Sequence, residues 1–395
     1  MKSFKSLIKI VLCIAAGIVL ASSLAFSVSS EESDNNNDND VSAFAYCLYC
    51  ANNAQIVAAK NENVRLPPAS TTKIMTAILG IEAQQADDTD INITMTEDLY
   101  AEGSSMYLNS GEVVRLSDVI GGMMMVSGND AANAIAKTIG GSSEGFAELM
   151  NQKARALELH DTHFVTPSGL DANEHFTTAY DLARLMAYCM ENDEFRAVVS
   201  SSSITVDFVL PYGKTQTYYN ENKLLRQYEY CIGGKTGYTD LAGRTLVSCA
   251  EKDGVKLICV TLNDPNDWND HEQLFEYGFS VMSMTEASTV TPQICIDVVG
   301  GEEDSVETTV GQPPLVCQGT GDVQTHFEVP PFLYAPITKG QQVGSIKYYT
   351  NGVYAGKADI FAAEDIELSN SKTNFIENIV SFYLSCWDKH TLKEH

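Results

Sequence analysis

The sequence predicts an α/β protein of the α+β kind, in which a helical cluster packs beside an antiparallel sheet. A small all-β domain and a C-terminal amphipathic helix are expected to follow. Two observations lead to this fold class. Strand-like patterns come first along the chain, then helical ones, then strands and one more helix. Near Ala287 the composition changes to Val, Thr, Gly and Pro without helical periodicity. A chain of 395 residues is long enough for two such folded units.

Residues 1–28 have the composition of a secretory signal peptide. Lys2, Lys5 and Lys9 give a positive start, and an almost wholly apolar run follows. The run approaches the ~20 residues that a membrane-spanning helix needs, so a retained anchor is the alternative. Serines near its end favour cleavage. We therefore expect the chain to be exported to the outer face of the cytoplasmic membrane or the cell wall.

Residues 29–42 are predicted to be an acidic linker, since the stretch 31–40 contains no apolar residue. The whole chain has 52 acidic and 25 basic residues, which gives a formal net charge of −27. This charge argues against nucleic acid as a partner. It also argues against purely electrostatic attachment to an anionic membrane.

Residues 43–286 are predicted to form the first folded domain. It opens with a strand pair that turns at Asn52-Asn53, because apolar and aromatic residues flank this polar pair. Helices are expected at 70–84, 116–125, 131–139, 146–157 and 178–190. A hairpin of strands 244–250 and 255–262 and a last helix over 271–282 are expected to follow. The polar segment 264–270 is expected to be a solvated loop.

Residues 287–364 are predicted to form the all-β domain, with turns at Gly300-Gly301, Pro313-Pro314 and Asn351-Gly352. The tail over 370–390 is predicted to be a helix with one apolar face. That face comprises Phe375, Ile376, Ile379, Val380, Tyr383 and Trp387. Such a helix either lies in the membrane surface or docks on the β domain.

The ten cysteines do not suggest a complete set of disulfides. Cys13 lies in the predicted signal peptide, which leaves an odd number. Cys47 and Cys50 form C-x-x-C in an apparent strand, a weak signal for redox or metal chemistry. If the chain has a disulfide, we expect it between Cys295 and Cys317. Three others lie in apolar runs and are expected to be buried: Cys189, Cys249 and Cys259.

Ser70-Thr71-Thr72-Lys73 is a candidate catalytic motif. A Ser and a Lys at i and i+3 share one face of a helix, so the amine can reach the hydroxyl. The residues after Lys73 are mostly apolar, and poor solvation lowers the pKa of an amine. The sequence therefore predicts Ser70 as a nucleophile and Lys73 as its base. No metal or cofactor is expected, since His160 and His163 have no evident third ligand.

Two more motifs follow, Ser127-Gly128-Asn129 and Lys235-Thr236-Gly237. Together the three resemble the S-x-x-K, S-x-N and K-T-G set of the penicillin-recognising serine acyl-enzymes. The residues flanking them resemble the D-alanyl-D-alanine carboxypeptidases, which are low-molecular-mass penicillin-binding proteins of peptidase family S11. The resemblance covers roughly 43–279. It implies a β-lactamase/DD-peptidase-like catalytic domain at 43–286, with its cleft between helices and sheet.

The resemblance also implies roles for the motif residues. Ser127 would relay a proton to the leaving amine, and Asn129 would orient the substrate amide. Lys235 and Thr236 would bind the terminal carboxylate of the substrate. Gly237 would leave room for a peptide beside the strand.

The oxyanion hole is implied to consist of the backbone amides of Ser70 and Tyr238. The implied reaction removes the terminal D-alanine from peptidoglycan stem pentapeptides, with β-lactams as covalent inhibitors. A D,D-endopeptidase or transpeptidase, a class A β-lactamase and a catalytically silent wall scaffold remain alternatives. Against the β-lactamase, we find no convincing E-x-x-x-N segment between the second and third motifs. Arg244 either reaches the substrate carboxylate or pairs with an acid.

Overall fold

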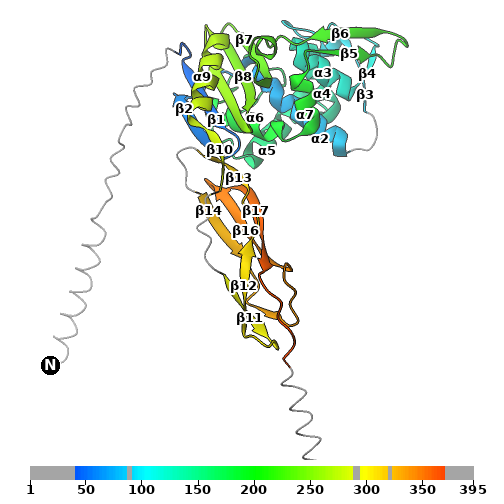
Figure 1. Cartoon of the computed structure of the whole chain (residues 1–395). Helices are drawn as coiled ribbons and strands as arrows, with labels where there is room; N and C mark the ends of the chain where they lie inside the picture. Colours follow the sequence, from blue (N-terminus) through cyan, green and yellow to red (C-terminus); the bar gives the residue numbers. More distant parts are fainter. Residues whose placement is uncertain (1–40, 87–90, 288–293, 319–322, 370–395) are drawn as a thin grey trace, which may run out of the picture. The chain divides into compact units, whose positions relative to one another are not determined.

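The computed structural model describes residues 41–86, 91–287, 294–318 and 323–369 (Figure 1). The predicted signal peptide, the linker up to residue 40 and the predicted tail helix lie outside these residues. Within the described ranges, no helix combines the length and the apolar character that crossing a membrane requires.

The main sheet has five antiparallel strands in the order β2-β1-β9-β8-β7. These strands are β1 (Ala45–Cys50), β2 (Gln55–Lys60), β7 (Cys231–Thr239), β8 (Gly243–Lys252) and β9 (Val255–Leu262). Both predicted hairpins are present, β1 with β2 and β8 with β9. Because β1 pairs with β9 along its whole length, the start and the end of the domain build one sheet.

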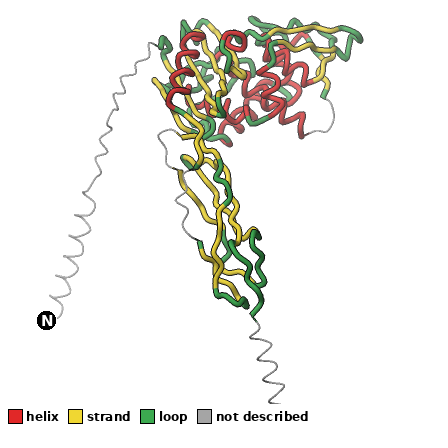
Figure 2. The backbone as a smooth tube through the Cα atoms, viewed as in Figure 1, coloured by secondary structure: helices red, strands yellow, loops and turns green. Residues whose placement is uncertain are grey.

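Helices gather beside this sheet and against it (Figure 2). They are η1 (Ala69–Thr72), α2 (Lys73–Ala86), η2 (Glu97–Leu99), α3 (Leu116–Val126), α4 (Asn129–Gly140), α5 (Ser143–Ala156), α6 (Ala179–Met190), α7 (Asp193–Ser200), α8 (Leu224–Gln227) and α9 (Asp267–Val281). Three of them begin at side-chain caps: Ser142 accepts from the amide of Gly145, Thr178 from that of Asp181, and Asn192 from that of Glu194. The apolar faces of the helices and the inner face of the sheet form one core. Two small hairpins complete this part, β3 (Asn92–Thr94) with β4 (Val113–Arg115) and β5 (Ser203–Asp207) with β6 (Thr215–Tyr219).

The segment 264–270 differs from the expectation of a solvated loop. Asp264, Asp267 and Asp270 are buried, and α9 begins four residues before its predicted start. The hydroxyl of Ser42 lies within hydrogen-bond distance of Asp264 Oδ1 and of Asp270 Oδ2. A buried carboxylate needs such partners, and they are remote in sequence, so the local pattern did not reveal them.

The second unit contains a six-stranded sheet in the order β14-β16-β17-β12-β11-β15, and β10 pairs with β13. Its strands are β10 (Ser283–Glu286), β11 (Cys295–Val299), β12 (Ser305–Val310), β13 (Leu315–Gln318), β14 (Val323–Glu328), β15 (Phe332–Tyr334), β16 (Gln342–Thr350) and β17 (Val353–Ala362). Asn351 and Gly352 join β16 to β17, both with positive φ, as a two-residue hairpin turn requires. A separate apolar core holds this all-β domain together.

The cysteines within the described residues are free thiols. Cys47 and Cys50 are three positions apart in β1, so their side chains leave opposite faces of the sheet and cannot form one site. The expected pairing of Cys295 with Cys317 is wrong. Cys295 is exposed on β11, whereas the Cys317 sulfur lies 3.6 Å from that of Cys50.

Candidate active site

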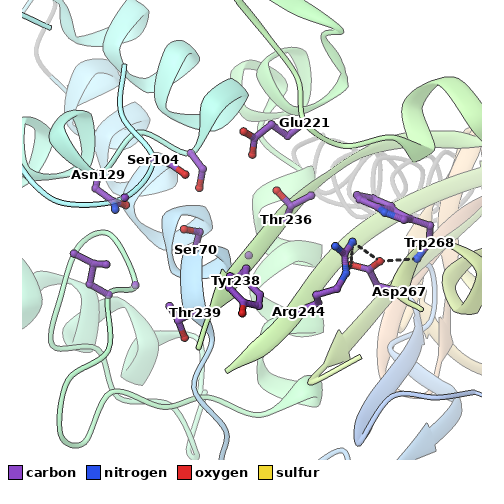
Figure 3. Close-up of a pocket in the computed structure, with 15 residues that line it drawn as sticks. Ser70, Ser104, Asn129, Glu221, Thr236, Tyr238, Thr239, Arg244, Asp267 and Trp268 are labelled. Carbon is purple, nitrogen blue, oxygen red and sulfur yellow. Dashed lines mark hydrogen bonds and ion pairs between the residues drawn. The ribbon is translucent and has the colours of Figure 1, made fainter. Parts of the chain in front are cut away.

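A cleft of about 400 Å³ lies between the helical cluster and β7, the edge strand of the main sheet. All three sequence motifs contribute to its lining (Figure 3). The lining residues are Ser70, Gly103, Ser104, Ser127, Asn129, Gly169, Leu170, Glu221, Thr236, Gly237, Tyr238, Thr239, Arg244, Asp267 and Trp268. The structure therefore brings together residues that the sequence separates widely.

The hydroxyl and the amine of the first motif are in contact. Ser70 lies in η1 and Lys73 opens α2, and Nζ of Lys73 is 2.8 Å from Oγ of Ser70. The same amine donates to Oδ1 of Asn129 at 2.8 Å and to the carbonyl oxygen of Ser168 at 2.6 Å. Nδ2 of Asn129 donates to the carbonyl of Glu102 at 2.7 Å, so its Oδ1 must face the lysine. Three contacts thus fix the amine beside the predicted nucleophile.

Burial disfavours the charged form of Lys73. The side chain is fully buried, and this desolvation is the main reason that its pKa lies well below 10.5. The positive charge of Lys235 lowers the pKa further, while Glu221 and Asp130 act in the opposite direction without reversing the shift. Its three hydrogen-bond partners are neutral groups. The surroundings therefore favour a neutral amine, which is the form that accepts a proton.

The second motif forms the turn between α3 and α4. Ser127 ends α3 with a left-handed φ of 59°, and Gly128 is the N-cap residue of α4. A Cβ on Gly128 would lie 2.9 Å from Oδ1 of Asp130 and 3.0 Å from the backbone nitrogen of Met106, so the turn requires glycine. The Ser127 hydroxyl is buried and has no hydrogen-bond partner among the described residues. Since Ser127 lines the cleft, this hydroxyl is available to a bound substrate.

The third motif supplies the opposite wall through β7. Lys235 is buried, and its Nζ donates to the carbonyl oxygen of Thr236 at 2.8 Å. Burial lowers the pKa of Lys235 to about 8, against the opposing influence of Glu221. Near neutral pH this amine is therefore mostly charged. A cation beside the Thr236 hydroxyl makes this end of the cleft attractive to an anionic group.

Two glycines allow the backbone near Ser70 to approach its neighbours closely. A Cβ on Gly237 would lie 2.9 Å from the backbone nitrogen of Ser70, and one on Gly169 would lie 1.8 Å from the carbonyl oxygen of Ala69. Ala69 has a φ of 49°, which is strained for a residue with a side chain. Ser70 and Tyr238, the two residues of the expected oxyanion hole, both line the cleft. Substrate carbonyl and backbone amides can therefore meet there.

The sequence patterns did not indicate several residues that line the cleft, among them Ser104, Glu221 and Trp268 (Figure 3). Trp268 lies in the first turn of α9, next to an ion pair in which Arg244 Nη2 is 2.7 Å from Asp267 Oδ1. Arg244 therefore pairs with an acid, and it also lines the cleft. A periodic pattern could not reveal these residues, because each lies on a different element and only folding brings them together.

His175 supports the cleft from behind and is not among the residues that line it. Its Nδ1 accepts hydrogen bonds from the backbone amides of Val165 at 2.9 Å and Thr166 at 3.2 Å. Nε2 therefore carries the hydrogen and donates to Oγ1 of Thr72 at 2.9 Å. Burial lowers the pKa of His175 to about 4, so the ring is neutral. These contacts give this histidine a structural role.

Comparison with known proteins identifies the family. The family model described as D-alanyl-D-alanine carboxypeptidase matches residues 30–266, more than half of the chain. The chain belongs to this family of serine peptidases. A second model, described as the C-terminal domain of penicillin-binding protein 5, matches residues 285–368 and so covers the all-β domain.

Relatives and solved structures agree with this assignment. The chain is 31% identical over 350 residues to the D-alanyl-D-alanine carboxypeptidase DacC of Escherichia coli, covering 83% of this chain and 85% of that relative. It is 29% identical over 325 residues to DacF of Bacillus subtilis, covering 79% and 83%. The structure of penicillin-binding protein 5 from Haemophilus influenzae matches with a TM-score of 0.60 and 28% identity, covering 83% of this chain and 98% of that one. The predicted α/β fold with a C-terminal β domain is confirmed.

Proposed function

We propose that this D-alanyl-D-alanine carboxypeptidase removes the terminal D-alanine of peptidoglycan stem pentapeptides through an acyl-enzyme on Ser70. The observation that carries the proposal is the environment of Lys73. Its amine is buried, touches the Ser70 hydroxyl at 2.8 Å and has a pKa well below its ordinary value. These are the properties that a base needs to activate a serine.

The acylation step follows from the contacts of Lys73. A neutral amine has two hydrogens and one lone pair. The carbonyl oxygens of Asn129 and Ser168 can only accept, so they take the two hydrogens. The lone pair then faces the Ser70 hydroxyl and accepts its proton as Oγ attacks the penultimate D-alanine carbonyl. The backbone amides of Ser70 and Tyr238 stabilise the developing oxyanion.

Breaking the peptide bond requires a proton on the leaving nitrogen. Ser127 is suited to deliver it, because its hydroxyl is buried at the cleft and lacks any other partner among the described residues. Protonated Lys73 returns the proton through this hydroxyl, and D-alanine leaves. Lys235 and Thr236 hold the carboxylate of the substrate during the reaction. Gly237 leaves room for the peptide beside β7.

Water then hydrolyses the ester on Ser70, which releases the shortened stem peptide and restores the enzyme. A β-lactam acylates the same serine, but its ring-opened product stays attached and blocks the approach of water. The proposal therefore includes β-lactam antibiotics as long-lived covalent inhibitors.

The decisive experiment is intact-mass spectrometry after brief exposure to benzylpenicillin, with the Ser70→Ala variant beside the parent. We expect one stable drug adduct on the parent and none on the variant. A second assay follows D-alanine release from a synthetic peptide that ends in D-Ala-D-Ala. Release by the parent and none by Ser70→Ala would support the carboxypeptidase reaction.

Each alternative gives a different result in these assays. Rapid drug hydrolysis without a lasting adduct would point to a β-lactamase. No adduct on intact protein would point to a silent scaffold. An adduct without D-alanine release, but with cleavage of cross-linked stem peptides, would point to a D,D-endopeptidase.

The proposal places the enzyme outside the cytoplasm, where peptidoglycan lies. Residues 1–28 would direct export, and the segment 370–390 would lie in the membrane surface as an amphipathic helix. Both assignments come from sequence pattern, as do the domain limits 43–286 and 287–364. Sedimentation with phospholipid vesicles tests the tail: the chain from residue 29 should bind, and a version that ends at residue 369 should not.

A further inference from the structure

Two buried thiols face each other where β13 lies against the end of β1. The sulfur atoms of Cys50 and Cys317 are 3.6 Å apart, and both side chains are almost fully buried. They are 267 positions apart in the sequence. A hydrogen bond also connects β13 to the turn after β1, since Nδ2 of the buried Asn53 donates to the carbonyl oxygen of Cys317 at 3.4 Å.

Strand geometry explains why the two thiols meet. Along β1, Tyr49 points into the core of the catalytic domain, so its neighbour Cys50 points to the opposite face. Along β13, Val316 points into the core of the all-β domain, so Cys317 points away from that core. Each cysteine therefore lies outside its own core and is covered by the other strand. The contact between the two thiols therefore lies where β13 meets β1, outside both hydrophobic cores.

We propose that Cys50 and Cys317 form a disulfide that ties β13 covalently to β1. The required sulfur–sulfur bond is about 2.05 Å long, so the two sulfur atoms must approach each other by roughly 1.5 Å. A metal site is a poorer explanation, because the described residues hold no group of three His, Cys, Asp or Glu that could bind an ion. The two domains are already joined by the chain itself, which runs from β9 through α9 and β10 to β11. The proposed disulfide would be a second covalent connection between them.

The oxidant is a disulfide compound, either a thiol oxidoreductase in its disulfide form or a small disulfide such as oxidised glutathione. The thiolate of Cys50 attacks one sulfur of the oxidant and expels the other as a thiolate, which leaves a mixed disulfide. Cys317 then loses its proton and attacks the Cys50 sulfur, expelling the second half of the oxidant. Two electrons pass from the cysteines to the oxidant, which leaves as two thiols.

Cys50 is the better first nucleophile of the pair. The hydrogen bond from Cys317 lowers the pKa of the Cys50 thiol and outweighs the opposing effect of burial. The same contact raises the pKa of the Cys317 thiol. Since both thiols are buried in the folded chain, an oxidant reaches them before β13 docks on β1. Oxidation should therefore be fast during folding and slow afterwards.

The test refolds the full chain from guanidinium with dithiothreitol into a buffer of reduced and oxidised glutathione, followed by alkylation and peptide mapping. We expect one cross-linked pair of peptides that contain Cys50 and Cys317, and a chain about 2 Da lighter than the reduced form. Recovery of both cysteines in alkylated form, or a cross-link from Cys317 to Cys295, would overturn the proposal. The map uses the parent chain, so it decides the question even where a variant fails to fold.

Unfolding temperature gives an independent measurement. The oxidised parent should unfold about 5 °C or more above the reduced parent, since a cross-link restricts the unfolded chain. Cys50→Ser and Cys317→Ser should each abolish this difference. Cys295→Ser is the matched control, because it removes an exposed thiol of the same domain, and it should keep the difference. Equal unfolding temperatures of oxidised and reduced parent would also contradict the proposal.

Discussion

The two walls of the cleft each contain a buried lysine, and they use it differently. On the helical wall, Lys73 donates to neutral acceptors and touches Ser70, and its pKa falls well below its ordinary value. On the strand wall, Lys235 donates to Thr236, and its pKa falls only to about 8. In the proposed mechanism the same side chain serves as a base on one wall and as a cation on the other. Burial is the main cause of both shifts, and the positive charge of Lys235 lowers the pKa of Lys73 further.

A buried neutral histidine stands behind each wall. His175 donates to Thr72 of η1 and so supports the helical wall. His271 lies between Ser248 of β8 and Thr261 of β9, with Nδ1 2.5 Å from the first hydroxyl and Nε2 3.0 Å from the second. Burial lowers the pKa of His271 to about 3. The helical wall is therefore held by a side-chain contact at Thr72, next to Ser70, and the strand wall by contacts between α9 and the sheet behind it.

The largest expected effect comes from removing the base. Lys73→Met keeps most of the length of the side chain and removes the amine, so acylation by benzylpenicillin should slow by about 1,000-fold or more. The acylation rate is measured by mass spectrometry, from the time course of adduct formation. The thermal midpoint should stay close to that of the parent, because an apolar chain replaces a buried amine. Acylation within tenfold of the parent rate would show that Lys73 is not the base.

Lys235→Arg tests the other wall through the pH dependence of acylation. In the parent, the rate should fall at low pH as Lys73 gains a proton, and at high pH as Lys235 loses its charge above about 8. Arginine stays charged throughout this range, so the upper limb should disappear and the lower limb should remain. At about pH 9.5 the parent should be roughly 30-fold below its maximum and the variant within about threefold of its own. If the acylation rate of Lys235→Arg still falls at high pH as in the parent, a group other than Lys235 causes that fall.

His271 should make stability depend on pH. Its pKa is 6.5 when unfolded and about 3 when folded, so below pH 6.5 the unfolded chain takes up a proton that the folded chain does not. The contribution is therefore complete above pH 6.5 and is lost as the pH falls towards 3. Between pH 6.5 and about pH 5 the free energy of unfolding should drop by about 2 kcal/mol from this group.

Guanidinium unfolding at both pH values measures this drop. The drop in the free energy of unfolding should be about 2 kcal/mol smaller in His271→Gln than in the parent. It should be unchanged in His160→Gln, a control at an exposed position. Identical drops in parent and His271→Gln would mean that the buried ring does not govern the acid sensitivity. His175 adds a loss of the same sign, since its pKa is lowered to about 4.

The smallest effect is expected at Glu221, which faces both lysines across the cleft. Its negative charge raises the pKa of Lys73 and of Lys235. Glu221→Gln should therefore move both limbs of the acylation profile to lower pH by a few tenths of a unit. Glu148→Gln, on α5 and away from the cleft, is the matched control and should move neither. A shift of one limb alone would show that Glu221 acts on a single wall.

Much of the fold could be predicted from sequence, because the decisive patterns are local. The spacing of Ser70 and Lys73 on one helical turn and the polar pair Asn52-Asn53 between two strands need only neighbouring residues. Solvent exposure was harder to predict. Asp264 and Asp270 suggest a loop by composition, yet both are buried, and Ser42, more than 220 positions away, donates hydrogen bonds to them.

The sequence by itself determined which residues we propose as nucleophile and base, since the three motifs and their order lie in short stretches of chain. Only the tertiary structure decided how those residues act. Lys73 meets Asn129 and Ser168 across 56 and 95 positions, and those contacts orient its amine. The meeting of Cys50 with Cys317 likewise depends on two strands from different domains. The periodicity of apolar residues predicts local secondary structure. The pKa and the contacts of a side chain depend instead on which groups the folded chain places within a few ångströms of it.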